Sequence, residues 1–117
     1  MCGFAGFLTH SPNFSSPKAI LGAMGDAIYT RGPDSQGQFF DSANGIGLSF
    51  RRLSILDLSE AGSQPMQSIS GRYVITFNGE IYNYLDLRKE IEIESSSPIN
   101  WNGHSDTETL LACIELY

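Results

Sequence analysis

Cysteine is scarce in this chain of 117 residues, which contains only Cys2 and Cys113. Two thiols do not indicate a disulfide framework, because the first residues lack the basic segment and the long apolar segment of a secretory signal. Two cysteines cannot form a zinc site alone, and His10 and His104 do not lie at metal-ligand spacing from them. We therefore expect a cytoplasmic protein with no metal site in this chain.

Basic residues and long apolar runs are also few. The chain has 7 Lys and Arg against 13 Asp and Glu, which gives a net charge of −6. The basic residues cluster only as Arg51-Arg52 and Arg88-Lys89, so binding to a nucleic-acid backbone is not expected. No apolar run approaches the ~20 residues that span a bilayer. Apolar residues nevertheless make up 41% of the chain, enough to form a core.

The first half of the chain alternates between strand and helix patterns. A short apolar run over 3–8 predicts a buried strand approached closely by another backbone. Ser16-Pro17 predicts an N-cap followed by Pro in the first turn, opening an amphipathic helix over about 17–30. Strands are expected at 38–40 and 46–51, joined by the hairpin signal Asn44-Gly45. Residues 31–35 and 59–70 are expected to be loops.

The second half predicts one more strand and two helices. Alternation over 73–77 indicates a strand, and Asn83 is expected to cap a helix over about 84–92. In that helix Tyr84, Leu87 and Ile91 should face inward, with Arg88, Lys89 and Glu92 on another face. Residues 95–98 read as an exposed loop, and Ser105 to Glu108 match a capping box that opens a last helix. This order of elements predicts an α+β fold.

The length allows at most one domain. The chain stops on an apolar, periodic stretch from Leu110 to Tyr117 with no basic or glycine cap, so we expect that it ends inside a helix. Cys113, within this stretch, is expected to be a small buried hydrophobic residue.

Cys2 differs from Cys113 because of its position. If the initiator Met1 is removed, Cys2 carries a thiol and a free α-amine on one residue. The pKa of such an amine is about 7.7–8.0, so it can accept the thiol proton. On its own, a cysteine at the second position is weak evidence.

Three polar clusters at predicted element ends complete a chemical set with Cys2. Asn78-Gly79 can supply an oxyanion hole, because an amide and a backbone N–H both donate hydrogen bonds. Arg52 and Asp106 carry the charges that would bind the carboxylate and ammonium of an amino acid. Each cluster has a simpler interpretation: a solvated strand edge for Arg51-Arg52, a turn for Asn78-Gly79, and a helix-dipole acid for Asp106.

Six segments in order resemble the N-terminal glutaminase domain of class II glutamine amidotransferases, and more narrowly the glutamine-hydrolysing asparagine synthetases. The resemblance covers nearly the whole chain and is far more specific than any single motif. Phe50 departs from it, standing where many relatives have His, which affects only the expected local packing. The matching segments are Met-Cys-Gly-Phe-Ala-Gly at 1–6, Arg-Gly-Pro-Asp-Ser at 31–35, Arg-Arg-Leu-Ser-Ile-Leu-Asp-Leu-Ser at 51–59, Gly-Ser-Gln-Pro-Met at 62–66, Phe-Asn-Gly-Glu-Ile-Tyr-Asn at 77–83 and Ser-Asp-Thr-Glu at 105–108.

The resemblance implies a role for each matching residue. Cys2 would be the nucleophile, and Asn78 and Gly79 would form the oxyanion hole. The residues expected to bind substrate are Arg52 for the carboxylate, Glu80 and Asp106 around the ammonium, and the backbone of Ile55 and Leu56. Arg31-Gly32-Pro33-Asp34 would form the loop beside the nucleophile.

The resemblance also implies a fold and a reaction. The fold would be the four-layer α/β/β/α sandwich of the N-terminal nucleophile hydrolases, with residues 1–117 forming most of it and later strands missing. Such a piece would have some tendency to form a homo-oligomer. The reaction would be hydrolysis of glutamine to glutamate and ammonia. No cofactor is expected in this chain, whereas ATP and Mg are expected in a separate synthetase domain that amidates aspartate to asparagine.

Three alternatives remain open at this point. The ammonia acceptor could be another carboxylate, such as a sugar acid in surface-polysaccharide synthesis. The chain could be a non-catalytic module of the same fold, or a cysteine hydrolase of another amide. Arg52 and Asp106 disfavour the last alternative, because they suit a free amino acid.

Overall fold

A computed structural model describes residues 2–11, 15–54 and 59–117. The chain divides into two compact units, and each is described by itself. The first contains residues 1–54, 63–65 and 76–78, and the second contains residues 55–62, 66–75 and 79–117. The described residues thus form a small mixed α and β structure.

A three-stranded antiparallel sheet forms the centre of the first unit. Its strands are β1 (Gly3–Leu8), β2 (Ser35–Asp41) and β3 (Ile46–Arg52), in the spatial order β1-β3-β2. The hairpin expected around Asn44-Gly45 is confirmed, although β2 begins earlier than the pattern indicated. Asp41 closes the turn, because its carboxylate accepts hydrogen bonds from the N–H groups of Ala43 and Asn44.

Helix α1 (Pro17–Ala27) follows β1 and is continued by the 3₁₀ turn η1 (Tyr29–Arg31). Pro17 stands in the first turn and Ser16 is the N-cap residue, both as expected. Ser16 has a left-handed backbone with φ 57°, and within the described residues its side chain makes no capping hydrogen bond. Its carbonyl oxygen instead accepts from the N–H groups of Ala19 and Ile20.

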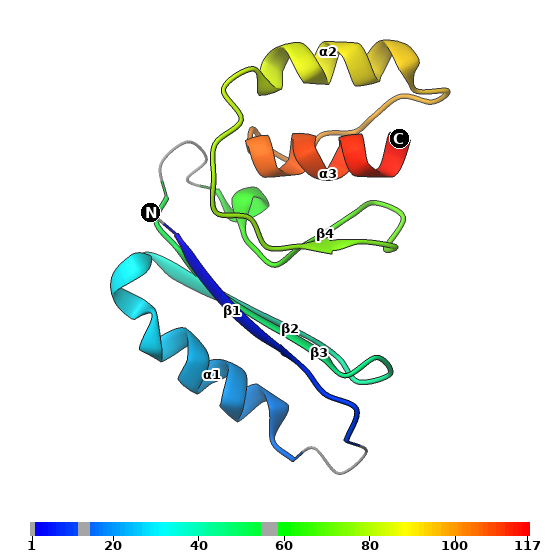
Figure 1. The fold of residues 1–117 in the computed structure, drawn as a ribbon. Coiled ribbons are helices and arrows are strands. Elements are labelled where there is room, and N and C mark those ends of the chain that lie inside the picture. The colour runs from blue at the N-terminus through cyan, green and yellow to red at the C-terminus, as the bar shows by residue number, and fades with distance from the viewer. Residues whose placement is uncertain (1, 12–14, 55–58) are drawn as a thin grey trace. The chain divides into compact units, whose positions relative to one another are not determined.

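Helix α1 covers one face of this sheet (Figure 1). The approach is close at Gly25, where an added Cβ would lie 2.8 Å from the hydroxyl of Ser49 on β3. On the opposite face, Phe50 is 1% exposed while its neighbour Phe4 is 51% exposed. The prediction that β1 is a buried strand is therefore wrong for this face, because Phe4 and Leu8 remain open to solvent.

The second unit contains a smaller sheet than expected. Strands β4 (Met66–Gln67) and β5 (Val74–Ile75) pair antiparallel, so the predicted 59–70 loop includes a short strand and the predicted 73–77 strand is shorter. The 3₁₀ turn η2 (Glu60–Gly62) precedes them. Ser68 fixes the turn between the strands, since its N–H donates to the carbonyl of Tyr73.

Helices α2 (Tyr84–Glu94) and α3 (Asp106–Leu116) complete the second unit. They run in the same direction, and the segment 95–105 returns between them (Figure 1). Asn83 is the N-cap residue of α2 as expected, but its side chain makes no capping hydrogen bond within the described residues. Its backbone carbonyl accepts from the N–H groups of Asp86 and Leu87. The cap by Ser105 is confirmed, as its hydroxyl accepts from the Thr107 N–H at 3.1 Å.

The described part of the chain contains no helix that is both long and apolar enough to cross a membrane.

Candidate active site

Cys2 lies immediately before β1, in the first unit, and is half-buried. Its sulfur accepts a hydrogen bond from the N–H of Leu53 at 3.3 Å and lies 3.5 Å from the carbonyl oxygen of the same residue. Leu53 directly follows β3, and β3 pairs with every residue of β1 from Gly3 to Leu8. The antiparallel register therefore brings the second residue of the chain against the end of β3.

The loop over residues 31–34 packs beside this thiol. A Cβ added at Gly3 would lie 2.9 Å from the Cβ of Arg31, so only glycine fits next to Cys2. Asp34 connects the loop to the end of β3 with both its backbone and its side chain. Its N–H donates to the carbonyl of Arg52 at 3.0 Å, and its carboxylate accepts from the Ser54 N–H at 2.8 Å.

Arg51 and Arg52 are both buried, being 8% and 9% exposed. The alternative that they form a solvated strand edge is therefore wrong. Arg51 points toward α1, where it donates to the carbonyl of Gly25 at 3.0 Å and to the carboxylate of Asp26 at 2.5 Å. Alternation along β3 directs Arg52 to the other face of the sheet, away from these partners. Arg51 stabilises the helix–sheet contact, and Arg52 remains the candidate for substrate binding.

Asn78 belongs to the first unit and is exposed. The preceding residue, Phe77, is held by a side chain: its N–H donates to the Oε1 of Gln64 at 2.6 Å. Gly79 and Glu80 are also exposed and belong to the second unit.

Asp106 is the first residue of α3 and is 7% exposed. Its carboxylate accepts a hydrogen bond from the N–H of Ile81 at 2.8 Å. This bond brings Asp106 next to Glu80, the residue before Ile81, so two of the predicted substrate residues are neighbours. Asp106 is thus more than a helix-dipole acid. Ile55 and Leu56, the other predicted pocket residues, lie outside the described residues.

Arg88 is a buried residue that its sequence pattern does not predict. The pattern puts Arg88 on another face of its helix than the inward Tyr84, Leu87 and Ile91, but Arg88 is 8% exposed. Its guanidinium donates to the hydroxyl of Thr109, to the carbonyls of Gly103 and Ser105, and to the carboxylate of Glu108. It also lies 4.0 Å from the centre of the Trp101 ring. No sequence pattern in α2 signals this, because the partners come from α3 and from a return segment that has no periodicity.

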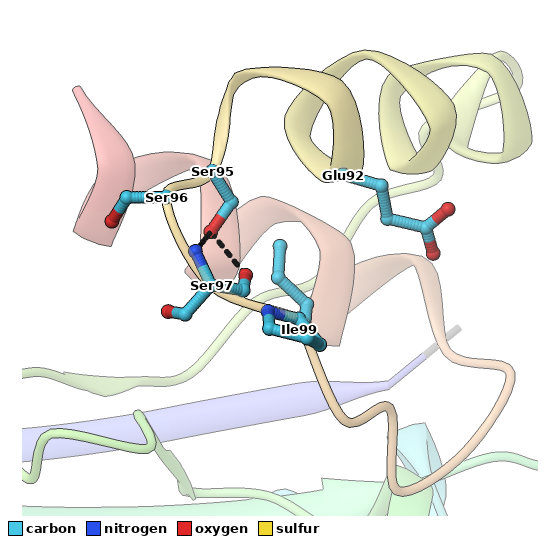
Figure 2. Close-up of a pocket in the computed structure, with 6 residues that line it drawn as sticks. Glu92, Ser95, Ser96, Ser97 and Ile99 are labelled. Carbon is cyan, nitrogen blue, oxygen red and sulfur yellow. Dashed lines mark hydrogen bonds between the residues drawn. The ribbon is translucent and has the colours of Figure 1, made fainter.

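An open hollow lies over the loop that follows α2, and Figure 2 shows its lining. The residues are Glu92, Ser95, Ser96, Ser97, Pro98 and Ile99. Ser95 closes the loop, because its hydroxyl donates to the Ser97 carbonyl and accepts from the Ser97 N–H. The carboxylate of Glu92 points away from the serines in Figure 2 and accepts from the indole of Trp101 at 2.6 Å. None of the predicted site residues lines this hollow.

Cys113 is half-buried in α3 rather than fully buried. Burial, and the nearby carboxylate of Glu90, raise the pKa of its thiol above the usual value. A raised pKa keeps the thiol protonated at neutral pH, so Cys113 is a poor nucleophile.

Comparison with known proteins identifies relatives over the whole chain. The family model described as the glutamine amidotransferase domain matches residues 1–117. The asparagine synthetase [glutamine-hydrolyzing] 1 of Bacillus subtilis is 44% identical over 119 residues, which cover all of this chain and 18% of that protein. The amidase chry2 of Gibberella zeae is 33% identical over all of this chain and 18% of that protein.

A third relative also matches nearly the whole chain. The putative asparagine synthetase [glutamine-hydrolyzing] 2 of Methanocaldococcus jannaschii is 35% identical over 95% of this chain and 23% of that protein. The chain thus spans about a fifth of the length of these curated relatives. Together the family match and these relatives show that the chain belongs to the glutamine amidotransferase domain family of enzymes.

Proposed function

We propose that this chain hydrolyses the side-chain amide of glutamine through a thioester on Cys2. The observation that carries the proposal is the position of the Cys2 thiol, which lies against the backbone of Leu53, directly beside the buried Arg52. The nucleophile thus lies against the residue that directly follows Arg52, a cation that can bind a carboxylate. The family of the chain gives the substrate class.

In this proposal the α-amine of Cys2, freed by removal of Met1, accepts the thiol proton. The thiolate then attacks the side-chain carbonyl carbon of glutamine, and the carbonyl oxygen becomes an oxyanion that Asn78 and Gly79 stabilise by donating hydrogen bonds. The carbon–nitrogen bond breaks, and the leaving nitrogen takes the proton from the α-ammonium and departs as ammonia. Water, deprotonated by the amine, cleaves the thioester and releases glutamate.

The remaining predicted residues would orient the substrate. Arg52 would bind its carboxylate, and Glu80 and Asp106 would surround its ammonium group. The backbone of Ile55 and Leu56 would line the pocket. Binding both ends of a free amino acid favours glutamine over other amides, because an unmatched buried charge is costly.

We further propose that the chain is part of the four-layer α/β/β/α sandwich of N-terminal nucleophile hydrolases. The α1 layer on the β1-β3-β2 sheet supports this, since it supplies two adjacent layers. The names of the bacterial and archaeal relatives support aspartate as the ammonia acceptor. ATP and Mg²⁺ would then act in a separate synthetase domain, and no step assigned to this chain uses them.

The test is glutamine-dependent release of glutamate and ammonia by the purified chain. We expect Cys2→Ala to abolish the reaction, because burial raises the pKa of the Cys113 thiol and makes it a poor nucleophile. Cys113→Ala is the matched control and should retain the activity. Equal activity of the Cys2→Ala variant and the unmodified chain would refute the proposed nucleophile.

A further inference from the structure

One buried side chain connects the sheet that carries Cys2 to the segment that carries Asn78. Gln64 is 9% exposed, and its side-chain oxygen accepts the hydrogen bond of the Phe77 N–H at 2.6 Å. Phe77 is the residue immediately before Asn78. Both ends of this connection lie within the first compact unit.

The backbone of Gln64 is itself fixed on the sheet. A Cβ added at Gly37 would lie 2.0 Å from the carbonyl oxygen of Gln64, so the two backbones are in direct contact on β2. Gly37 pairs with Phe50 on β3, two residues before Arg52. Gln64 is therefore fixed on β2, and β2 pairs with β3. Arg52 is the last residue of β3, and the Cys2 thiol contacts the residue that follows it.

Residues 76–78 depend on this anchor because their own strand has ended. The pairing of β5 stops at Ile75, and residues 76–78 have no regular secondary structure. The Phe77 N–H thus donates to a side chain at a place where a strand would provide a carbonyl. This hydrogen bond of 2.6 Å joins two uncharged groups, and its acceptor is buried. It fixes the backbone of Phe77, one residue before Asn78.

We propose that Gln64 is a positioning residue, which holds Asn78 in place to stabilise the oxyanion above Cys2. The inference rests on the proposed function, since it assigns Asn78 to the oxyanion hole. An oxyanion donor acts only when it is held in place before the charge develops. Gln64 touches neither the substrate nor the reacting atoms in this proposal, and it acts through Phe77.

The principal test compares Gln64→Met with the unmodified chain in glutamine hydrolysis. Methionine has a similar length but does not replace the amide oxygen as an acceptor. We expect kcat to fall about ten- to a hundredfold, because small misplacement of a catalytic group costs up to about a hundredfold, while KM changes less than about twofold. Gln67→Met is the matched control, because the exposed side chain of Gln67 donates at a long 3.5 Å to the carbonyl of Gly71.

A second readout separates positioning from general damage. The γ-semialdehyde of glutamate adds to the thiol of Cys2 and forms an oxyanion in the same place as the reaction. We expect its inhibition constant to rise in parallel with the loss of kcat in Gln64→Met, with the affinity for glutamate unchanged. Equal losses for the aldehyde and for glutamate would overturn the proposal, because a merely structural role would weaken both.

A conservative pair keeps the test decisive if Gln64→Met does not fold. The carboxylate that Gln64→Glu introduces can still accept from the Phe77 N–H, whereas the shorter side chain of Gln64→Asn cannot reach it. We expect Gln64→Glu to keep most of kcat and Gln64→Asn to lose it. Equal kcat values in the two variants would contradict the proposal. Lack of hydrolysis and of Cys2 reactivity in the unmodified chain would instead refute the proposed function itself.

Discussion

Single residues with the same chemistry have different tasks in this chain. Arg51 and Arg52 are neighbours in sequence, yet strand alternation sends them to opposite faces of one sheet. Arg51 donates hydrogen bonds to the carbonyl of Gly25 and the carboxylate of Asp26, so it stabilises the contact with α1. Arg52 is the buried arginine that adjoins the residue holding the Cys2 thiol. The pair shows why the type of residue alone does not assign a function.

The buried guanidinium of Arg88 is expected to stabilise the folded chain. Its guanidinium pairs with the half-buried Glu108 and donates to the buried Thr109, so removal of the charge leaves that carboxylate and that hydroxyl without this partner. We expect Arg88→Met to lower the free energy of unfolding by about 3–5 kcal/mol, the usual cost of breaking a buried pair. Urea unfolding followed by the fluorescence of Trp101, which lies 4.0 Å from this guanidinium, measures the effect.

Lys89 provides the matched control for that experiment. It is the next residue along α2, and its ion pair with Asp86 is exposed on both sides. Lys89→Met should change the free energy of unfolding by less than about 1 kcal/mol. Similar losses in the two variants would show that burial does not distinguish these two basic residues.

At the scale of elements, the β2–β3 hairpin depends on a glycine. Gly45 has φ +67°, and a Cβ added there would lie 1.9 Å from the carbonyl oxygen of Thr9. Gly71 also has a positive φ of +73°, but its nearest atom, on Gln67, is 3.5 Å away. The two positions share the backbone conformation and differ in the available space.

We expect Gly45→Ala to be more damaging than Gly71→Ala. The left-handed backbone costs about 1–2 kcal/mol in both variants. At Gly45 the backbone clash adds about 1–3 kcal/mol, because the strands must move apart. Thermal unfolding followed by circular dichroism checks this difference, and equal transition temperatures for the two variants would be inconsistent with the hairpin described here.

The turn of the same hairpin should respond to pH. Hydrogen bonds from the side chain and the N–H of Asn44 lower the pKa of Asp41. A carboxylate with a lowered pKa stabilises the folded state above its unfolded pKa, and this stabilisation is lost as the pH falls through the folded pKa. Asp41→Ala should therefore lower the melting temperature at pH 7, and the difference should shrink below about pH 4. A difference independent of pH would contradict this origin.

Patterns of apolar residues predicted the elements better than their ends. The hairpin, the three helices and the cap by Ser105 follow from local signals, and the structure has them. Ser16 and Asn83 are the N-cap residues that local signals predict, but in the described part of the chain their side chains make no capping hydrogen bond. Their backbone carbonyls accept from N–H groups of the first turn. The burial of Arg88 could not be predicted, since it depends on a return segment distant in sequence.

At the scale of the whole molecule, the candidate site draws on residues far apart along the chain. The sequence motifs could name Cys2, Arg52 and Asp106, but not the bonds that hold them, such as the one from Leu53 to the Cys2 sulfur. Gln64 belongs to one of the matching motifs, but the motif does not predict that its side chain accepts a hydrogen bond from Phe77. The chain spans about a fifth of the length of its curated relatives, so the use of the released ammonia is a proposal.

In our proposal, Cys2 is an N-terminal nucleophile for glutamine. The most direct measurement treats the purified chain with a glutamine analogue whose side-chain amide is replaced by a diazoketone. The diazo carbon takes up the proton that left the thiol, and the thiolate then displaces nitrogen gas from that carbon and forms a stable thioether. Intact mass and peptide mapping then locate the adduct.

We predict a chain that lacks Met1 and carries one adduct on Cys2. Cys113 should stay unmodified at neutral pH, because burial raises the pKa of its thiol. A folded chain that retains Met1, or that leaves Cys2 unlabelled, would contradict the account.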